Sequence, residues 1–119
     1  MANRSKDKGT AWETSIVGYL REHGVPHAER RALCGGSDRG DLAGVPGVVC
    51  EAKSAAKVEL AGWLDEANRE RDNDGADVGL VWFKRRGKAS PGAGFVLMDG
   101  ATLVRLLAAA GYIPNGAPA

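Results

Sequence analysis

The chain has 119 residues, a length that fits one compact domain with a hydrophobic core of its own. Apolar residues make up 44% of it, which excludes a disordered tail, and no apolar run approaches the ~20 residues needed to cross a bilayer. The formal net charge of +1 is too small to indicate a nucleic-acid partner by itself.

The cysteines and the N-terminus bear on where the protein works. Cys34 and Cys50 have no CxxC spacing and belong to no dense cysteine framework, which favours a reducing intracellular setting. The N-terminus is polar and lacks an apolar signal core. These features predict a cytoplasmic protein without a membrane partner. The cysteines and the two histidines do not form a zinc-binding pattern.

The first half of the chain is predicted to be one helix followed by a β-meander. Residues 9–23 form the helix, because apolar and aromatic residues from Trp12 to Leu20 recur at spacings of three and four. Three strands follow over residues 27–33, 41–43 and 48–53. A glycine-rich loop at 35–40 and a Val-Pro-Gly turn at 45–47 separate these strands.

The second half is predicted to add two helices and two strands. A helix over 58–72 presents Leu60, Leu64 and Ala67 as its apolar stripe, which leaves Trp63 off the stripe as a candidate dimer contact. Strands over 77–83 and 95–98 flank a basic, glycine-rich loop at 84–94, and a helix over 102–110 turns Leu103 inward.

The predicted element order is α-β-β-β-α-β-β-α. It indicates an α/β fold with one mixed central β-sheet flanked by helices, in a single domain over residues 1–119. The ends, about 1–7 and 114–119, are predicted to be flexible.

Two carboxylates and a lysine are expected to converge on the third strand. Side chains alternate between faces along a strand, so Glu51 and Lys53 share a face with Ala52 opposite. A hairpin closed at 45–47 brings Asp41 beside Glu51. Two carboxylates suit Mg²⁺, and Lys53 can orient a water or stabilise charge on a phosphate. Phosphodiester hydrolysis is one interpretation, and alternating charges on an exposed strand edge are the other.

The D…E-x-K pattern resembles that of the PD-(D/E)xK nuclease superfamily. Within it, the chain is similar to the small archaeal-type Holliday junction resolvases and their phage relatives, from about Lys8 to Leu107. Gly40 stands where these nucleases often have a proline. The matching parts are Lys8-Gly9 followed by Glu13, then Arg30-Arg31, Gly35-Gly36-Ser37, Gly40-Asp41 and Glu51-Ala52-Lys53.

The resemblance implies a restriction-endonuclease-like fold and a set of residue roles. Asp41 and Glu51 would bind Mg²⁺, for which Mn²⁺ could substitute, with the Ala52 carbonyl as a further ligand. Lys53 would be the catalytic lysine. Glu13 would complete both the metal site and the catalytic set; its other interpretation is an exposed helix acid near a basic residue.

Local clusters of positive charge are predicted to bind DNA. The basic block at 84–88 could bind phosphates, although a solubilising hairpin tip would have the same composition. Ser37 is expected either to approach the cut strand or to be a plain turn residue. The predicted DNA-binding residues are Lys8, Arg30, Arg31, Ser37, Arg39, Lys84, Arg85, Arg86 and Lys88.

The leading hypothesis is a structure-selective DNA endonuclease that resolves four-way junctions as a homodimer, because a C2 dimer supplies two matched sites for two symmetric cuts. A restriction-type, repair or nicking endonuclease of the same fold is an alternative, as is a non-catalytic DNA-binding module. The Ala-, Gly- and Arg-rich composition and the likeness to phage relatives suggest a phage of a GC-rich bacterium, which would place the protein in the host cytoplasm.

Overall fold

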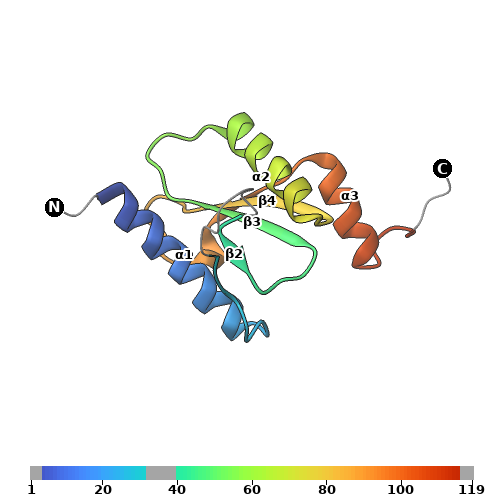
Figure 1. Cartoon of the computed structure of the whole chain (residues 1–119), viewed down its shortest axis with the longest axis horizontal. Helices are drawn as coiled ribbons and strands as arrows, with labels where there is room; N and C mark the ends of the chain where they lie inside the picture. The colour runs from blue at the N-terminus through green and yellow to red at the C-terminus, as the bar shows by residue number, and fades with distance from the viewer. Residues whose placement is uncertain (1–3, 32–39, 116–119) are drawn as a thin grey trace.

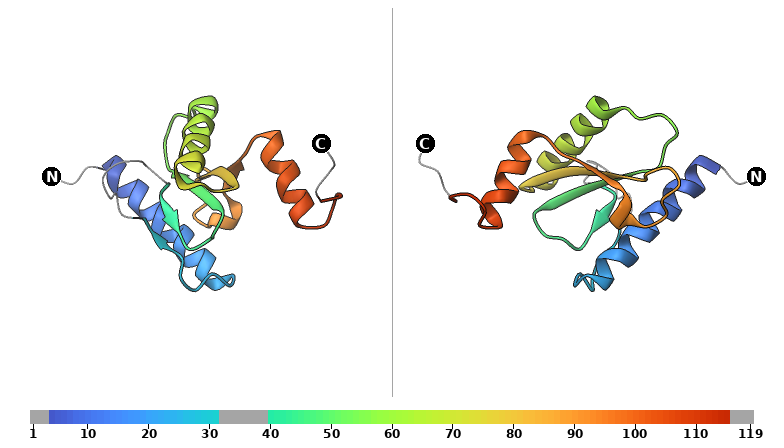
Figure 2. Two further views of the ribbon diagram at one scale, coloured as in Figure 1. Left: turned by 45° about the vertical axis from the view of Figure 1, so that its right-hand side comes forward. Right: turned by 180° about the vertical axis from the view of Figure 1, so that it is seen from behind.

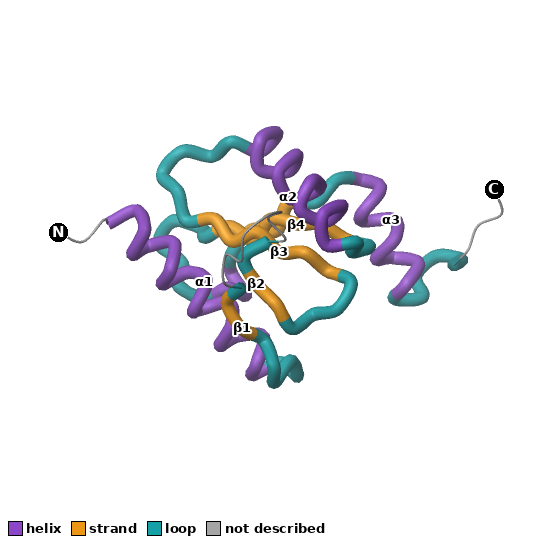
Figure 3. Tube along the Cα trace, in the orientation of Figure 1, coloured by secondary structure: helices purple, strands orange, loops and turns teal. Residues whose placement is uncertain are grey.

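A computed structural model describes residues 4–31 and 40–115. These residues contain both helices and strands in one small domain, so the predicted mixed α/β class is confirmed (Figure 1; Figure 3). The elements are α1 (Arg4–Glu22), β1 (Glu29–Arg30), β2 (Leu42–Ala43), β3 (Val48–Lys53), α2 (Leu60–Asp74), β4 (Val78–Phe83), the 3₁₀ turn η1 (Pro91–Ala93), β5 (Phe95–Leu97) and α3 (Gly100–Ala109).

The strands form two sheets, where the sequence predicted one central sheet. Strand β3 pairs in parallel with β4, which pairs antiparallel with β5, so this sheet is mixed. Strands β1 and β2 form a separate antiparallel pair. The predicted β-meander is therefore wrong as a continuous ladder. Strand β2 instead adjoins β3 at its start, where the Asp41 amide donates a hydrogen bond to the Cys50 carbonyl over 3.1 Å.

Glycine allows the small sheet to lie close to the preceding turn. Gly44 follows β2 with φ of +114°, and a Cβ atom there would lie 2.6 Å from Ala28 Cα. Only glycine accepts both that backbone angle and that approach. Ala28 and Leu42 are thereby buried in one core cluster with Cys50 of β3.

Helices α1 and α2 cover opposite faces of the three-stranded sheet (Figure 1; Figure 2). Side-chain alternation along β3 and β4 explains the two layers. Cys50 packs in the cluster centred on Trp12 and Ile16 of α1. Val81 packs in a second cluster with Ala67 of α2. Glu51 and Lys53 lie on the α2 side of β3, because they alternate with Cys50 and Ala52.

The buried face of α2 differs from the predicted one. Trp63, Ala67 and Glu70 are buried, whereas Leu60 is 48% exposed. The Trp63 ring packs on the Phe83 ring of β4, with 5.3 Å between centroids. The interpretation of Trp63 as a dimer contact is therefore wrong, because its side chain belongs to the core. Leu103 of α3, predicted to face inward, is also exposed.

A glycine in β4 lets α2 approach the sheet closely. A Cβ atom on Gly79 would lie 2.8 Å from the Ala67 carbonyl oxygen of α2. The close approach also holds the α2 side chains that neighbour Ala67 on the same face near strand β3. None of the helices in the described residues combines the length and apolar character needed to cross a membrane.

Candidate metal and phosphate site

Glu51 is a buried carboxyl group in the middle of the molecule. It lies on β3, opposite Val81 of β4, and is only 3% exposed. Its Oε1 atom accepts no hydrogen bond from any described N–H or O–H group. A buried carboxyl oxygen without a donor is costly, and such atoms occur where a ligand supplies the missing interaction. Glu51 is therefore the natural centre of a candidate site.

Helix α2 brings two further carboxylates to Glu51. Glu66 and Glu70 are four residues apart, so they lie on the same face of the helix. One carboxylate oxygen from each of Glu51, Glu66 and Glu70 lies within 4.8 Å of the other two. These three residues are called the glutamate cluster below.

Lys53 joins the glutamate cluster from the next inward position of β3. Its Nζ lies 2.9 Å from Glu66 Oε1, within hydrogen-bond distance, and 3.7 Å from Glu51 Oε2. The side chain is 24% exposed, so the ammonium group is oriented by the carboxylates and still reachable from solvent. Such a group can contact a phosphate at the edge of the cluster.

Asp41 lies beside the cluster, as the predicted turn required, but it has a defined contact. Its Oδ2 atom accepts a hydrogen bond from the Ala52 backbone amide over 2.8 Å. Ala52 lies between Glu51 and Lys53, so Asp41 fixes the backbone that carries both side chains. The prediction that these three residues converge is met, with Asp41 bound to the main chain of β3.

The pKa values of Glu51 and Glu66 are shifted in opposite directions. Burial, followed by contacts with Glu70 and Glu66 and the charge of Asp41, raises the pKa of Glu51 to about 12. The hydrogen bond from Glu51, aided by Lys53, lowers the pKa of Glu66. Burial alone would lower the pKa of Lys53, but Glu66, Glu51 and Asp41 outweigh it and the net shift is upward. Glu51 thus holds a proton while Lys53 stays charged.

The glutamate cluster fits a hard divalent cation. Mg²⁺ and Mn²⁺ favour carboxylate oxygens, and the buried Oε1 of Glu51 lacks a donor. A cation would replace the proton on Glu51 and remove the repulsion among three acids. The residues that would hold it are Glu51, Glu66 and Glu70, of which the sequence predicted only Glu51.

Glu13 has a different contact from the one predicted. Its Oε2 atom accepts a hydrogen bond from Arg30 Nε over 3.3 Å and forms an ion pair with the same guanidinium group. Glu13 is not a member of the glutamate cluster found in the described residues. Arg31, another predicted DNA contact, forms an ion pair with Asp74 at the end of α2 over 3.4 Å. Both arginines therefore have contacts that stabilise the fold.

Three of the other predicted DNA-binding residues meet in one groove. Lys8 of α1, Lys84 and Arg86 all line an open groove of about 610 Å³. Arg85 lies over the Phe95 ring, 5.5 Å from its centroid, and Lys88 is exposed in the same segment. Ser37 and Arg39 lie outside the described residues.

The sequence contained a signal for Glu66 and Glu70 that the predicted stripe obscured. Positions 63, 66, 67 and 70 lie on one helical face at spacings of three and four, and Trp63 and Ala67 are apolar. A stripe that contains Leu60 and Leu64 instead directs the side chains at positions 63, 66 and 70 toward solvent.

No protein-family model, curated protein or solved structure matches this chain in the comparisons with known proteins.

Proposed function

We propose that this chain is a metal-dependent endonuclease that hydrolyses phosphodiester bonds in DNA. One observation carries the proposal: Lys53 lies between Glu51 and Glu66, at the rim of a buried glutamate cluster that has a carboxyl oxygen without a donor. Carboxylates for a cation next to a charged lysine for a phosphate are the groups that this reaction needs.

Each residue has a role that follows from its contacts. Glu51, Glu66 and Glu70 would hold Mg²⁺ or Mn²⁺, which when bound polarises a phosphoryl oxygen and lowers the pKa of a water. Lys53 remains protonated and stabilises negative charge on the phosphate. Asp41 is a positioning residue here, because its carboxylate binds the Ala52 amide and so sets the direction of both neighbours on β3.

A binding module without catalysis is the less favoured function. Buried carboxylates next to a phosphate site weaken DNA binding by repulsion unless a cation neutralises them. Glu51 avoids that repulsion by holding a proton in the metal-free protein, but a DNA-binding module would need no ionisable group there, because a glutamine would fit the same space. Three acids in one cluster, two of them buried, are therefore better explained by cation binding than by DNA binding alone.

The substrate within this class is proposed to be branched DNA, and the most specific form is a four-way junction cut by a homodimer. This step depends on the resemblance of the Asp41…Glu51-Ala52-Lys53 pattern to the junction resolvases. Two symmetric cuts require two matched sites, which a C2 dimer supplies and one small chain does not.

Cleavage of matched synthetic substrates tests the proposal. The purified chain with Mg²⁺ is incubated with a four-way junction, a flap and a linear duplex that share one labelled strand. We expect the branched substrates to be cut and Asp41→Asn to bind DNA but cut it more slowly. Equal or faster cleavage of the linear duplex would reject junction resolution. Absence of cleavage of all three substrates would reject the enzyme.

A further inference from the structure

The basic groove has a charge pattern that suits a polyanion. Lys8 comes from α1, while Lys84 and Arg86 come from the segment after β4, so distant parts of the chain place three cations around one space. None of the residues that line the groove is acidic. None of the three cations forms an ion pair with a carboxylate in the part of the chain that the structure describes. Their charge is therefore available to phosphates.

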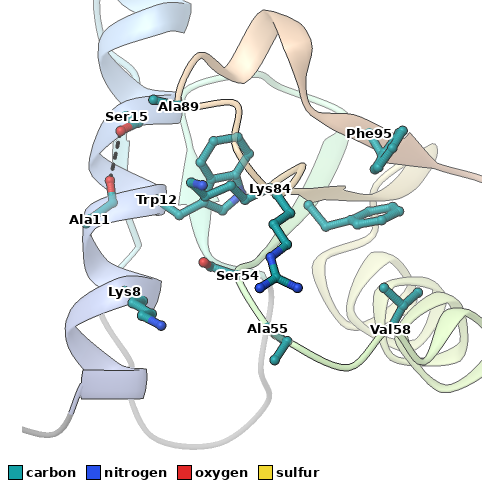
Figure 4. Close-up of a pocket in the computed structure, with 13 residues that line it drawn as sticks. Lys8, Ala11, Trp12, Ser15, Ser54, Ala55, Val58, Lys84, Ala89 and Phe95 are labelled. Carbon is teal, nitrogen blue, oxygen red and sulfur yellow. Dashed lines mark hydrogen bonds between the residues drawn. The ribbon is translucent and has the colours of Figure 1, made fainter.

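The walls of the same groove are apolar and partly aromatic. Phe95 is 46% exposed, and its ring packs on Phe83, which also lines the groove. Figure 4 shows Lys8 on the helix side, Phe95 on the strand side, and Ser54 and Ala55 on the segment between them. Arg85 lies over the Phe95 ring, 5.5 Å from its centroid, so a base would stack on the ring in place of this guanidinium group or against the guanidinium itself. An aromatic ring and an arginine beside phosphate contacts are a combination used for unpaired nucleotides.

The groove also adjoins the proposed catalytic site. Its floor includes Ser54, the residue after Lys53, and the Lys84 amide donates a hydrogen bond to the Lys53 carbonyl over 2.9 Å. The groove thus lies at the carboxyl ends of the parallel strands β3 and β4, where α/β folds place ligands. Lys53 itself does not line the groove, but the residues on either side of this connection, Ser54 and Lys84, do.

We propose that this groove binds an unpaired DNA strand, with its phosphates on Lys8, Lys84 and Arg86 and a base against Phe95. The inference rests on the proposed nuclease function and favours one of its branched substrates: a flap, which has a single-stranded segment beside the cut, over a four-way junction, whose arms are fully paired. Double-stranded DNA presents phosphates but keeps its bases stacked inside, so an aromatic wall gives it no advantage. A groove of about 610 Å³ falls within the volume range of sites that bind small molecules, which is enough space for a base and its sugar.

DNA binding measured without a divalent metal tests the groove independently of DNA cleavage. The full chain is titrated in EDTA against a fluorescein-labelled oligothymidylate of about ten nucleotides, and against a duplex of equal length, by anisotropy. We expect the single strand to bind more tightly. Phe95→Leu should weaken binding of the single strand about tenfold, because stacking on a base requires an aromatic ring. Phe95→Tyr keeps the ring and should bind the single strand as tightly as wild type.

Charge variants supply the second readout. Lys84→Ala and Arg86→Ala should each reduce the slope of log affinity against log salt by about 0.7 for the single strand. Arg69→Ala, which removes an exposed cation of α2 outside the groove, is the matched control and should leave affinity for the single strand unchanged.

Three outcomes would overturn the inference: equal affinity for duplex and single strand, equal affinity of Phe95→Leu and wild type, or competition by thymidine monophosphate as strong as by the oligonucleotide. The last would identify a mononucleotide site. Glu51→Gln should retain single-strand binding in EDTA. Retained binding with no cleavage by the wild type in Mg²⁺ would reject the nuclease and leave the groove assignment intact.

Discussion

Lys53 Nζ lies 2.9 Å from Glu66 Oε1, and this contact joins strand β3 to helix α2 at the candidate site. Glu66 lies on α2, the helix that connects the parallel strands β3 and β4, so its contact with Lys53 depends on how closely α2 packs on the sheet. Lys53 was expected from the sequence and Glu66 was not.

The first prediction concerns Glu51 in the metal-free protein. The folded-state pKa of Glu51 is raised to about 12 from 4.5, so its stabilising contribution is present below pH 4.5 and is lost as the pH rises toward 12. Glu51→Gln cannot ionise and keeps the shape. We expect the variant in EDTA to be more stable than wild type by about 1–3 kcal/mol at neutral pH, with a difference that grows with pH. Chemical denaturation at several pH values measures it.

Added Mn²⁺ or Mg²⁺ should reverse that order. The cation binds the folded wild type and stabilises it by mass action, whereas Glu51→Gln lacks the central ligand. A wild type that is not stabilised by either cation would contradict the cation site. A variant that is less stable than wild type in EDTA at every pH would contradict the protonated Glu51.

The second prediction distinguishes the glutamate cluster from the metal ligands that the resemblance implies, which include Glu13. Glu66→Gln and Glu70→Gln should each weaken Mn²⁺ binding about 10–100-fold, because each removes a carboxylate of the glutamate cluster. Glu13→Gln is the matched control: it removes an ion pair with Arg30 and should leave Mn²⁺ affinity within about twofold of wild type. Isothermal titration calorimetry measures all three. A large loss of Mn²⁺ affinity in Glu13→Gln, with no loss in Glu66→Gln, would contradict the glutamate cluster and support the ligand set that the resemblance implies.

The third prediction concerns the packing of α2 on β4. Gly79→Ala places a Cβ atom about 2.8 Å from the Ala67 carbonyl oxygen, so helix and strand must separate. We expect a loss of about 1–3 kcal/mol in the free energy of unfolding, and weaker Mn²⁺ binding, because Glu66 and Glu70 move with the helix.

Gly62→Ala is the control for that change. Gly62 lies in the same helix, and a Cβ atom there meets nothing within 4 Å. Alanine should raise helix stability by about 0.5–1 kcal/mol and leave Mn²⁺ binding unchanged. Equal stability of Gly79→Ala and wild type in urea denaturation would show that the close approach does not constrain α2.

The fourth prediction uses the thiol on the opposite face of β3. Burial, followed by the charges of Asp41 and Glu51, raises the pKa of the Cys50 thiol well above its ordinary value. In a Cys34→Ser background, Cys50 should therefore resist alkylation by iodoacetamide in the native protein, even at mildly alkaline pH, and react readily after denaturation. Rapid native alkylation, followed by mass spectrometry, would indicate that α1 does not cover this face as described.

The sequence pattern predicted the structure correctly where the alternation and burial of a strand decide it. Strand β3 was predicted with the observed ends because an apolar run between a proline turn and charged residues has few other structures. The same alternation placed Glu51 and Lys53 on one face. The short turn before β3 also brought Asp41 beside them, although its partner proved to be the Ala52 amide, a backbone group that no residue pattern specifies.

The sequence pattern did not predict the structure correctly where a polar residue is buried. Glu70 is fully buried, and an apolar-stripe search treats such a residue as solvent-facing. The predicted stripe therefore contained Leu60 in place of Trp63, and the predicted inward face of α2 pointed away from Glu66. The division into two sheets was missed for a related reason. Two-residue strands such as β1 and β2 carry too little alternation to indicate their partners.

The central claim is that the glutamate cluster and Lys53 cut DNA with a divalent cation, and single-turnover cleavage tests it most directly. Wild type and Glu51→Gln, each in excess over a labelled four-way junction and a flap, are mixed with Mg²⁺ and the cut strand is followed with time. The account predicts cleavage by wild type and a rate at least about a hundredfold lower for Glu51→Gln, with DNA binding retained. Equal rates for the two proteins, or no cleavage of either substrate by wild type, would contradict it.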